Sequence, residues 1–265
     1  MLITEKKFGI FKFVNVYFSE EPGTADIPDC DVIINHTYKN WGDIEGFERE
    51  NNFTATIDLT QDLDEIWSRI KRQHRRHIRR AEKDGTRVII SDNYEEFHQI
   101  HKRFLKQKKY GDLFGLKTLS LETMQKFGIL FIAVSQGETV GGNVYFLDGN
   151  NARLGCHAYL LKENNPDRYK QIADANCYLH WEAIRYFKNL NIINYDFGGL
   201  ASNQTTINHQ LSGLDYFIRS FGGNVIFQYE YRRFNSRFHR FLFHSWDFLY
   251  TLRYILPRLS KIQHK

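Results

Sequence analysis

The sequence has few of the residues that mark linkers, disulfide frameworks or membrane spans. Its 265 residues include only four prolines and three cysteines, and no tract rich in serine and glycine. Cys30, Cys156 and Cys177 are scattered and lack metal-ligand spacing, which argues against a disulfide framework and favours a reducing, cytoplasmic setting. No uncharged apolar run approaches the roughly 18 residues of a membrane-spanning helix, so we expect no such helix. The N-terminus is too polar for a signal peptide, so we expect none there.

Positive charge is concentrated in two segments. The chain has a formal net charge of +5, with 36 Lys and Arg against 31 Asp and Glu. Residues 71–83 hold seven Lys or Arg against one Glu, and residues 232–265 hold eight against Asp247 alone, so the remainder is acidic. Two basic segments on an acidic body favour a polyanionic partner such as RNA, phospholipid or a phosphorylated substrate. The alternative is that each segment is only a solvated helix face.

The order of the predicted elements favours a mixed α/β fold. Apolar residues at helical spacing predict one helix that starts from an N-cap at Thr60 and runs through Lys83. After residue 86 the patterns predict a strand, two helices, three antiparallel strands, a long helix from about Tyr169 to Asn189, a strand, a helix and a strand. This is the order of the GNAT acyltransferase fold. There, the strands before and after the long helix, 151–160 and 192–197, run parallel and splay apart, and unpaired amides in the splay can receive an acyl donor.

Three segments between residues 53 and 231 carry a family resemblance. They are IWSRIKRQHRRHIRRAEKDGTRVII, CYLHWEAIRYFKNLNIINYDFGGL and GLDYFIRSFGGNVIFQYEY, in that order. They resemble the Fem-type (FemABX) peptidyltransferases and, more loosely, the CelD/BioF-type acetyltransferases. The resemblance implies two GNAT-like halves. It also implies acyl transfer to an amine, typically of an amino acid from aminoacyl-tRNA onto a cell-wall peptide precursor.

The chain departs from this family in two places. Only about 85 residues precede the second half, so we predict a truncated N-terminal GNAT-like half at 1–85, an acyltransferase domain at 86–231 and basic amphipathic helices at 232–265. The family's closing element has Phe-Lys before its glycines, whereas this chain has Phe217-Ile218 followed by Arg219. One residue on a helix rotates the side chain by about 100 degrees. Arg219 is our candidate electrophilic group, and the alternative is a surface arginine.

The segment YDFGGL supplies the best-placed carboxylate. Asp196 ends the strand beside the splay, where it can hold or deprotonate an incoming amine or merely cap the loop of Gly198 and Gly199. Alternation along 152–160 places Arg153, His157 and Tyr159 on one face, where His157 and Tyr159 can transfer protons or be satisfied core groups. The other candidates are Asn143 and Tyr145 on the neighbouring strand and Lys109 and Tyr110 in a basic loop for substrate contact, and Arg75, Arg76, Arg79 and Arg80 for RNA or phosphate contact.

The acyl donor is predicted from the start of the long helix. CoA-using GNAT enzymes bind pyrophosphate there on a glycine-bearing loop, but this chain reads QIADAN, with Asp174 at an expected glycine. We therefore favour aminoacyl-tRNA over acyl-CoA, and we expect no permanently bound cofactor and no metal. A CoA-dependent N-acyltransferase and a non-catalytic RNA- or membrane-binding scaffold stay open as alternatives.

The expected partners follow from these assignments. They are tRNA, an amine-bearing envelope precursor and, through residues 232–265, an anionic membrane surface, whereas DNA is not expected. The C-terminal segment can equally dock on the domain or on another chain. The expected location is the cytoplasm, including the inner membrane face.

Overall fold

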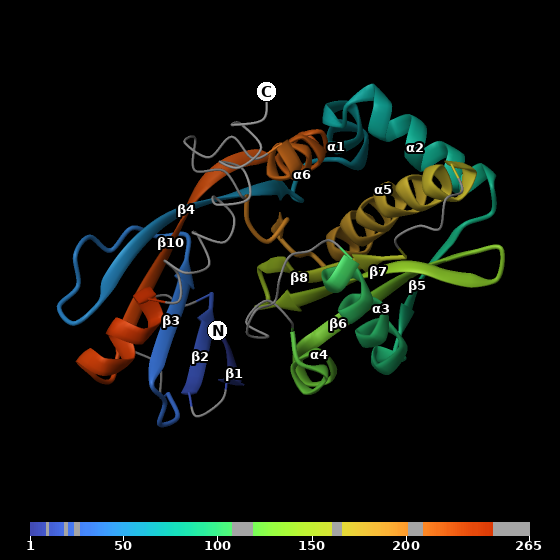
Figure 1. The fold of residues 1–265 in the computed structure, drawn as a ribbon. Helices are drawn as coiled ribbons and strands as arrows, with labels where there is room; N and C mark the ends of the chain where they lie inside the picture. Colours follow the sequence, from blue (N-terminus) through green and yellow to red (C-terminus); the bar gives the residue numbers. More distant parts are fainter. Residues whose placement is uncertain are drawn as a thin grey trace, which may run out of the picture.

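One continuous β-sheet organises the protein. The computed structural model describes residues 1–8, 11–18, 21–23, 27–107, 119–160, 166–200 and 209–245. The ten strands of these residues form one sheet in the order β1-β2-β3-β10-β4-β9-β8-β7-β6-β5 (Figure 1). Their bounds are β1 (Leu2–Phe8), β2 (Phe11–Tyr17), β3 (Val32–Thr37), β4 (Glu48–Asp58), β5 (Arg87–Ser91), β6 (Gly128–Ser135), β7 (Glu138–Leu147), β8 (Asn151–Tyr159), β9 (Asn194–Asp196) and β10 (Asn224–Phe234).

Helices cover both faces of the strands that follow residue 86. One core contains apolar residues of α1 (Leu63–Arg69), α2 (Arg72–Lys83), α5 (Pro166–Asn189) and α6 (His209–Arg219). The second core contains residues of α3 (Tyr94–Gln107) and α4 (Leu121–Phe127). Figure 1 shows α5 along one side of β6, β7 and β8, and α3 with α4 along the other. Residues 237–245 are also helical. In the part of the chain described here, no helix combines the length and apolarity that crossing a membrane requires.

The predicted fold class and element order are confirmed. Strands β6, β7 and β8 form an antiparallel ladder, and α5 connects β8 to the parallel strand β9. The predicted division at residue 85 stays a prediction. The sheet is nevertheless continuous across it, because β10 lies between β3 and β4 and pairs with both.

Three element boundaries differ from the prediction. The helix predicted to run from Thr60 through Lys83 is two helices, because Ile70 is extended (φ −65°, ψ 128°). This break buries the Ile70 side chain and lets the Lys71 N–H donate to the Ser220 carbonyl at 2.8 Å. The long helix begins at Pro166, since proline at the first helical position lacks only an N–H that has no helical partner. Strand β10 continues to Phe234, beyond the boundary predicted at 231, because its last residues pair with β3.

The predicted splay between β8 and β9 is confirmed. The two strands pair at only three positions, from Asn151 with Asn194 to Arg153 with Asp196. The chain then turns to β4, because the Phe197 N–H donates to the Ala55 carbonyl at 3.1 Å. Strand β8 continues to Tyr159 with no β9 partner among the described residues.

The glycine pair after α6 generates a stability prediction. Gly222 has φ +78°, and a Cβ there would lie 2.7 Å from both the Cβ and the carbonyl oxygen of Arg69 in α1. Gly42 has a similar φ of +68° but open space around it. Because positive φ alone costs an L-residue about 1–2 kcal/mol, Gly42→Ala should lower the unfolding free energy by about that amount. Gly222→Ala adds a backbone clash and should cost at least about 3 kcal/mol in urea denaturation. Equal losses for the two variants would contradict the close α6–α1 packing.

Candidate functional site

A row of polar side chains crosses six neighbouring strands on one face of the sheet. Residues paired in a ladder share a face, as do residues two apart on one strand. His36 pairs with Glu230, Gln228 pairs with Asn52, and Arg153 pairs with Asp196. This polar row consists of Tyr17 (β2), His36 and the following Tyr38 (β3), Glu230 and Gln228 (β10), Asn52 and Thr54 (β4), Asp196 (β9) and Arg153 (β8).

Asp196 anchors the polar row. Its carboxylate is 0% exposed and accepts hydrogen bonds from four donors. Oδ2 accepts from the Tyr38 hydroxyl at 2.5 Å and from Arg153 Nη1, while Oδ1 accepts from the Thr54 hydroxyl and from the Gly198 N–H at 2.8 Å. A buried carboxylate needs such compensation, because the loss of hydration otherwise costs several kcal/mol. Asp196 therefore joins β3, β4, β8 and the loop after β9.

These contacts favour the capping alternative for Asp196. The bond to the Gly198 N–H caps the loop directly, and no oxygen of the carboxylate lines the pocket described below. Burial and then the Asp196 charge raise the pKa of Tyr38 far above its ordinary value, so this phenol stays a donor. Direct removal of a proton from substrate would require Asp196 to give up one of these partners. Its catalytic assignment remains a prediction that the arrangement does not favour.

Arg153 presents the cation of the site. Its guanidinium also donates through Nη2 to the Gly198 carbonyl and to Gln228 Oε1, both at 3.1 Å. Burial lowers the pKa of Arg153, but the charge of Asp196 and the Tyr38 contact outweigh burial and raise it above its usual value. The group is therefore a fixed positive charge whose orientation is set by its partners.

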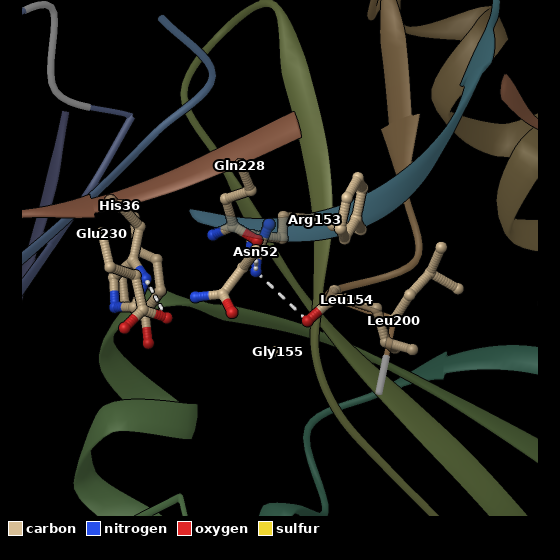
Figure 2. Close-up of a pocket in the computed structure, with 12 residues that line it drawn as sticks. His36, Asn52, Arg153, Leu154, Gly155, Leu200, Gln228 and Glu230 are labelled. Atoms are coloured by element: carbon tan, nitrogen blue, oxygen red, sulfur yellow. Dashed lines mark hydrogen bonds and ion pairs between the residues drawn. The ribbon is translucent and has the colours of Figure 1, made fainter. Parts of the chain in front are cut away.

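A pocket of about 320 Å³ opens where β8 and β9 part. This volume is at the lower end of the range of about 300–1,000 Å³ that small-molecule sites occupy. Gly198 (φ +86°) and Gly199 (φ +121°) form one wall, with backbone conformations that favour glycine. Figure 2 shows His36 and Glu230 together on one side, with Arg153, Leu154 and Leu200 on the other. The lining residues are Tyr17, His36, Asn52, Phe53, Arg153, Leu154, Gly155, Gly198, Gly199, Leu200, Gln228 and Glu230.

The prediction that Arg153 shares a face with His157 and Tyr159 is wrong. The β7–β8 register shifts so that Leu154 pairs with Tyr145 but Cys156 pairs with Val144, which leaves Gly155 as a bulge. A bulge inserts one residue and exchanges the two faces beyond it. Arg153 therefore joins the polar row, whereas His157 and Tyr159 lie on the other face, with their rings stacked at 6.4 Å.

On that other face, Asn143 and Tyr145 belong to a buried hydrogen-bonded chain. Asn143 donates to the Tyr145 hydroxyl at 2.9 Å, which contacts the Tyr195 hydroxyl at 2.7 Å, which in turn contacts His180 Nδ1 at 2.6 Å. Burial and then the neighbouring His157 lower the pKa of His180 to about 3, so the imidazole is neutral at pH 7. None of these residues lines the pocket, and Asn143 Oδ1 has no hydrogen-bond partner among the described residues.

The remaining candidates are scattered. Arg219 is exposed at the end of α6 and does not line the pocket, which matches the surface alternative, while Ile218 is buried in the core beside α5. Lys109 and Tyr110 lie outside the described residues. In this arrangement the cation at the pocket comes from Arg153 rather than from the closing helix.

The four candidate arginines of α2 divide into two pairs. Arg80 donates from Nε at 2.9 Å and from Nη2 at 2.6 Å to Asp174, and Arg75 donates to the Ser68 carbonyl at 3.3 Å. These two are engaged in intramolecular contacts, whereas Arg76 and Arg79 are exposed.

The structure corrects the assignment of Asp174. This residue is inside α5, is 3% exposed and is paired with Arg80. It therefore does not stand in a loop at the helix start, and its charge is neutralised. Asp174 supplies no argument against a CoA donor.

Sequence reasoning missed His36, Asn52, Gln228 and Glu230. His36, Gln228 and Glu230 lie in segments whose patterns indicate strands, and Asn52 immediately precedes another, but each segment's neighbours in the sheet are distant in sequence. The available signal was the alternation of polar and apolar residues over 52–55 in β4 and over 227–231 in β10. Such alternation indicates that the strand has a polar face, but it does not show which other residues lie next to that face.

Asp196→Asn tests the anchor. The substitution keeps the side-chain shape but leaves the buried Arg153 without its counter-charge, so the unfolding free energy should fall by about 3–5 kcal/mol. Asp43→Asn is the control, because this carboxylate is 96% exposed and should have no measurable effect on urea denaturation. A stability of Asp196→Asn equal to wild type would show that the buried pair does not hold the sheet.

Several solved structures share this arrangement of strands and helices. Neither a protein-family profile nor a curated protein matches the sequence. The C-terminal domain (DUF2156) of a protein assigned as a lysylphosphatidylglycerol synthetase, from Agrobacterium fabrum, superposes with a TM-score of 0.58 at 12% identity, covering 91% of this chain and 83% of that one. FemX gives 0.56 at 11% identity, covering 86% and 83%. L-PGS from Bacillus licheniformis gives 0.52 at 15% identity, covering 77% and 68%.

Identities this low establish the fold alone. The superpositions cover the greater part of this chain, including its mixed sheet. The chain therefore has a mixed α/β, GNAT-like fold.

Proposed function

We propose that this protein transfers an acyl or aminoacyl group from an activated donor to an amine. The observation that carries the proposal is the pocket at the splay of β8 and β9, with a fixed cation at its wall. Acyl transfer needs an oriented carbonyl and a positive or hydrogen-bonding environment for the oxyanion of the tetrahedral intermediate. Arg153 and the unpaired edge of β8 provide both in one place.

The proposed reaction assigns a separate task to each wall. The carbonyl oxygen of the donor faces Arg153 and the bulge at Gly155, while the amine nitrogen attacks the carbonyl carbon from the opposite side of the pocket. A carbon–nitrogen bond forms, and the bond to the donor's ester oxygen or thioester sulfur breaks. The acceptor first loses one proton to solvent and becomes a neutral amine. The leaving group then takes up the second proton, which the nitrogen releases as the new bond forms. Asp196 acts as a positioning residue that holds Arg153 in place, and Arg153 takes over the task that the family resemblance gives to lysine.

Aminoacyl-tRNA remains the favoured donor. Arg76 and Arg79 are exposed on α2 beside other exposed cations, Lys71 and Arg72, and such a surface attracts a phosphate backbone. An acceptor of the cell envelope is supported by the resemblance to Fem-type enzymes and by the name of a fold neighbour, lysylphosphatidylglycerol synthetase. Contact of the C-terminal segment with a membrane stays part of the proposal, and residues 246–265 lie outside the described part of the chain.

An acyl-CoA donor is the second candidate. The observation in its favour is the position of Asp174. This residue was the argument against pyrophosphate binding at the start of α5, but it lies inside the helix and is paired with Arg80. If neither donor supports transfer, we infer that the protein is a non-catalytic scaffold that binds RNA or a membrane.

A transfer assay separates these functions. Purified protein is offered charged tRNA or acyl-CoA together with candidate amine acceptors, and products are detected by mass spectrometry. Asn52 lines the pocket and makes no hydrogen bond with a described side chain, so Asn52→Trp should fill the pocket and lower the rate at least about a hundredfold. Asn51→Trp, one residue away on the exposed face, is the matched control and should retain activity within about twofold.

The outcomes of this assay are distinct. Transfer from acyl-CoA alone overturns the tRNA assignment, and transfer from neither donor favours the scaffold. Equal activity of the two tryptophan variants would remove the pocket from the reaction.

The basic helix generates a binding prediction. Every cation that neutralises a phosphate contributes about 0.7–0.9 to the slope of log affinity against log salt concentration. Arg76→Gln with Arg79→Gln should therefore weaken tRNA binding and reduce that slope by about 1–2, measured by fluorescence anisotropy. Arg49→Gln with Arg185→Gln removes the same charge elsewhere and should leave the slope unchanged. Identical slopes for both double variants would show that α2 does not contact the RNA and that its charges only face solvent.

A further inference from the structure

At the β2 end of the polar row, two hydrogen-bond acceptors face each other, one on His36 and one on Glu230. Tyr17, His36 and Glu230 occupy paired positions on β2, β3 and β10. The Tyr17 ring stacks on the His36 ring at 4.6 Å with an interplanar angle of 8°, which fixes the orientation of the imidazole. His36 Nδ1 then lies 3.5 Å from Glu230 Oε1. All three residues line the pocket, and Figure 2 shows His36 next to Glu230.

The hydrogen bond on the other ring nitrogen determines what His36 presents. His36 Nε2 lies 3.2 Å from the side-chain oxygen of Asn15, and an amide oxygen only accepts hydrogen bonds. Nε2 therefore carries the hydrogen. Burial, the largest influence, lowers the pKa of His36 to about 4, with Glu230 raising it and Arg153 and Arg232 lowering it further. At pH 7 the ring is neutral, so Nδ1 carries a lone pair and accepts a hydrogen bond.

Neither acceptor has a donor among the described residues. His36 Nδ1 is buried and has no hydrogen-bond partner in this part of the chain. Glu230 Oε2 accepts from Arg232 at 2.7 Å, but the described residues donate no hydrogen bond to Oε1. A buried acceptor without a donor costs about 1–3 kcal/mol. A group with several N–H donors and a positive charge would satisfy both atoms at once.

We propose that Tyr17, His36 and Glu230 form the acceptor-amine subsite of the pocket, which binds a primary alkylammonium group. The proposal rests on the proposed transfer function and specifies which wall receives the amine. Glu230 Oε1 and His36 Nδ1 each accept one N–H, and Asn52 lies on the neighbouring strand to accept the third. The subsite is formed by β2, β3 and β10, whereas Arg153 extends from β8.

Binding of n-butylammonium tests the subsite without any acyl donor. The ring nitrogens of His36 are followed by NMR in protein with isotope-labelled histidine, and His36→Gln identifies their signals. We expect a saturable shift of Nδ1 with n-butylammonium chloride. The neutral isostere n-butanol should produce none, because it lacks the charge and has a single donor.

Two glutamate variants provide the matched comparison. Glu230 and Glu50 both pair with Arg232, but only Glu230 lines the pocket. Glu230→Gln should weaken n-butylammonium binding at least about tenfold, because the neutral amide cannot make a charge-assisted hydrogen bond. Glu50→Gln should change it by less than about twofold. Should Glu230→Gln fail to fold, the comparison of n-butylammonium with n-butanol on the wild-type protein decides.

Several results overturn the subsite. They are an equal response to n-butanol, the absence of a saturable shift, or equal weakening by the two glutamate variants. Transfer activity without amine binding at His36 overturns the subsite alone. Amine binding without transfer activity overturns the proposed function and leaves the subsite standing.

Discussion

The buried ion pair between Arg153 and Asp196 is the interaction on which the rest of the site depends. It joins β8 to β9 at the last position where these strands pair, and its two hydroxyl partners, Tyr38 and Thr54, come from β3 and β4. The pair therefore fixes the point at which the sheet opens. Because both charges are compensated, the guanidinium can remain positive at the wall of a pocket without leaving an uncompensated charge in the interior.

The same pair connects β8 and β9 with the strands before residue 59. The pocket is lined by residues of β8 together with residues of β2, β3, β4 and β10. The strands from the chain's first part thus complete the site. The strands before residue 59 and those after residue 86 therefore belong to one sheet.

The sequence was sufficient for the fold because its signals are local. Helical spacing and hairpin-length turns predict the element order after residue 86, and the match of that order to the GNAT fold predicts the splay; both are confirmed. The site depends on contacts between residues far apart in the chain. Tyr38 and Asp196 are separated by 158 positions, and Arg80 and Asp174 by 94, so no local pattern indicates that either pair meets. The bulge at Gly155 is also invisible to strict alternation, which is why Arg153 was placed on the wrong face.

The central claim is that the acyl group lies in the splay between β8 and β9, against Arg153. A crystal structure with a non-hydrolysable donor analogue, an aminoacyl-adenosine amide or an acyl-CoA thioether ketone, tests it most directly. The account predicts that the analogue's carbonyl oxygen lies within hydrogen-bonding distance of Arg153 or of the free amides of β8. An analogue bound elsewhere, with the pocket between Gly155 and Gly199 unoccupied, would contradict it.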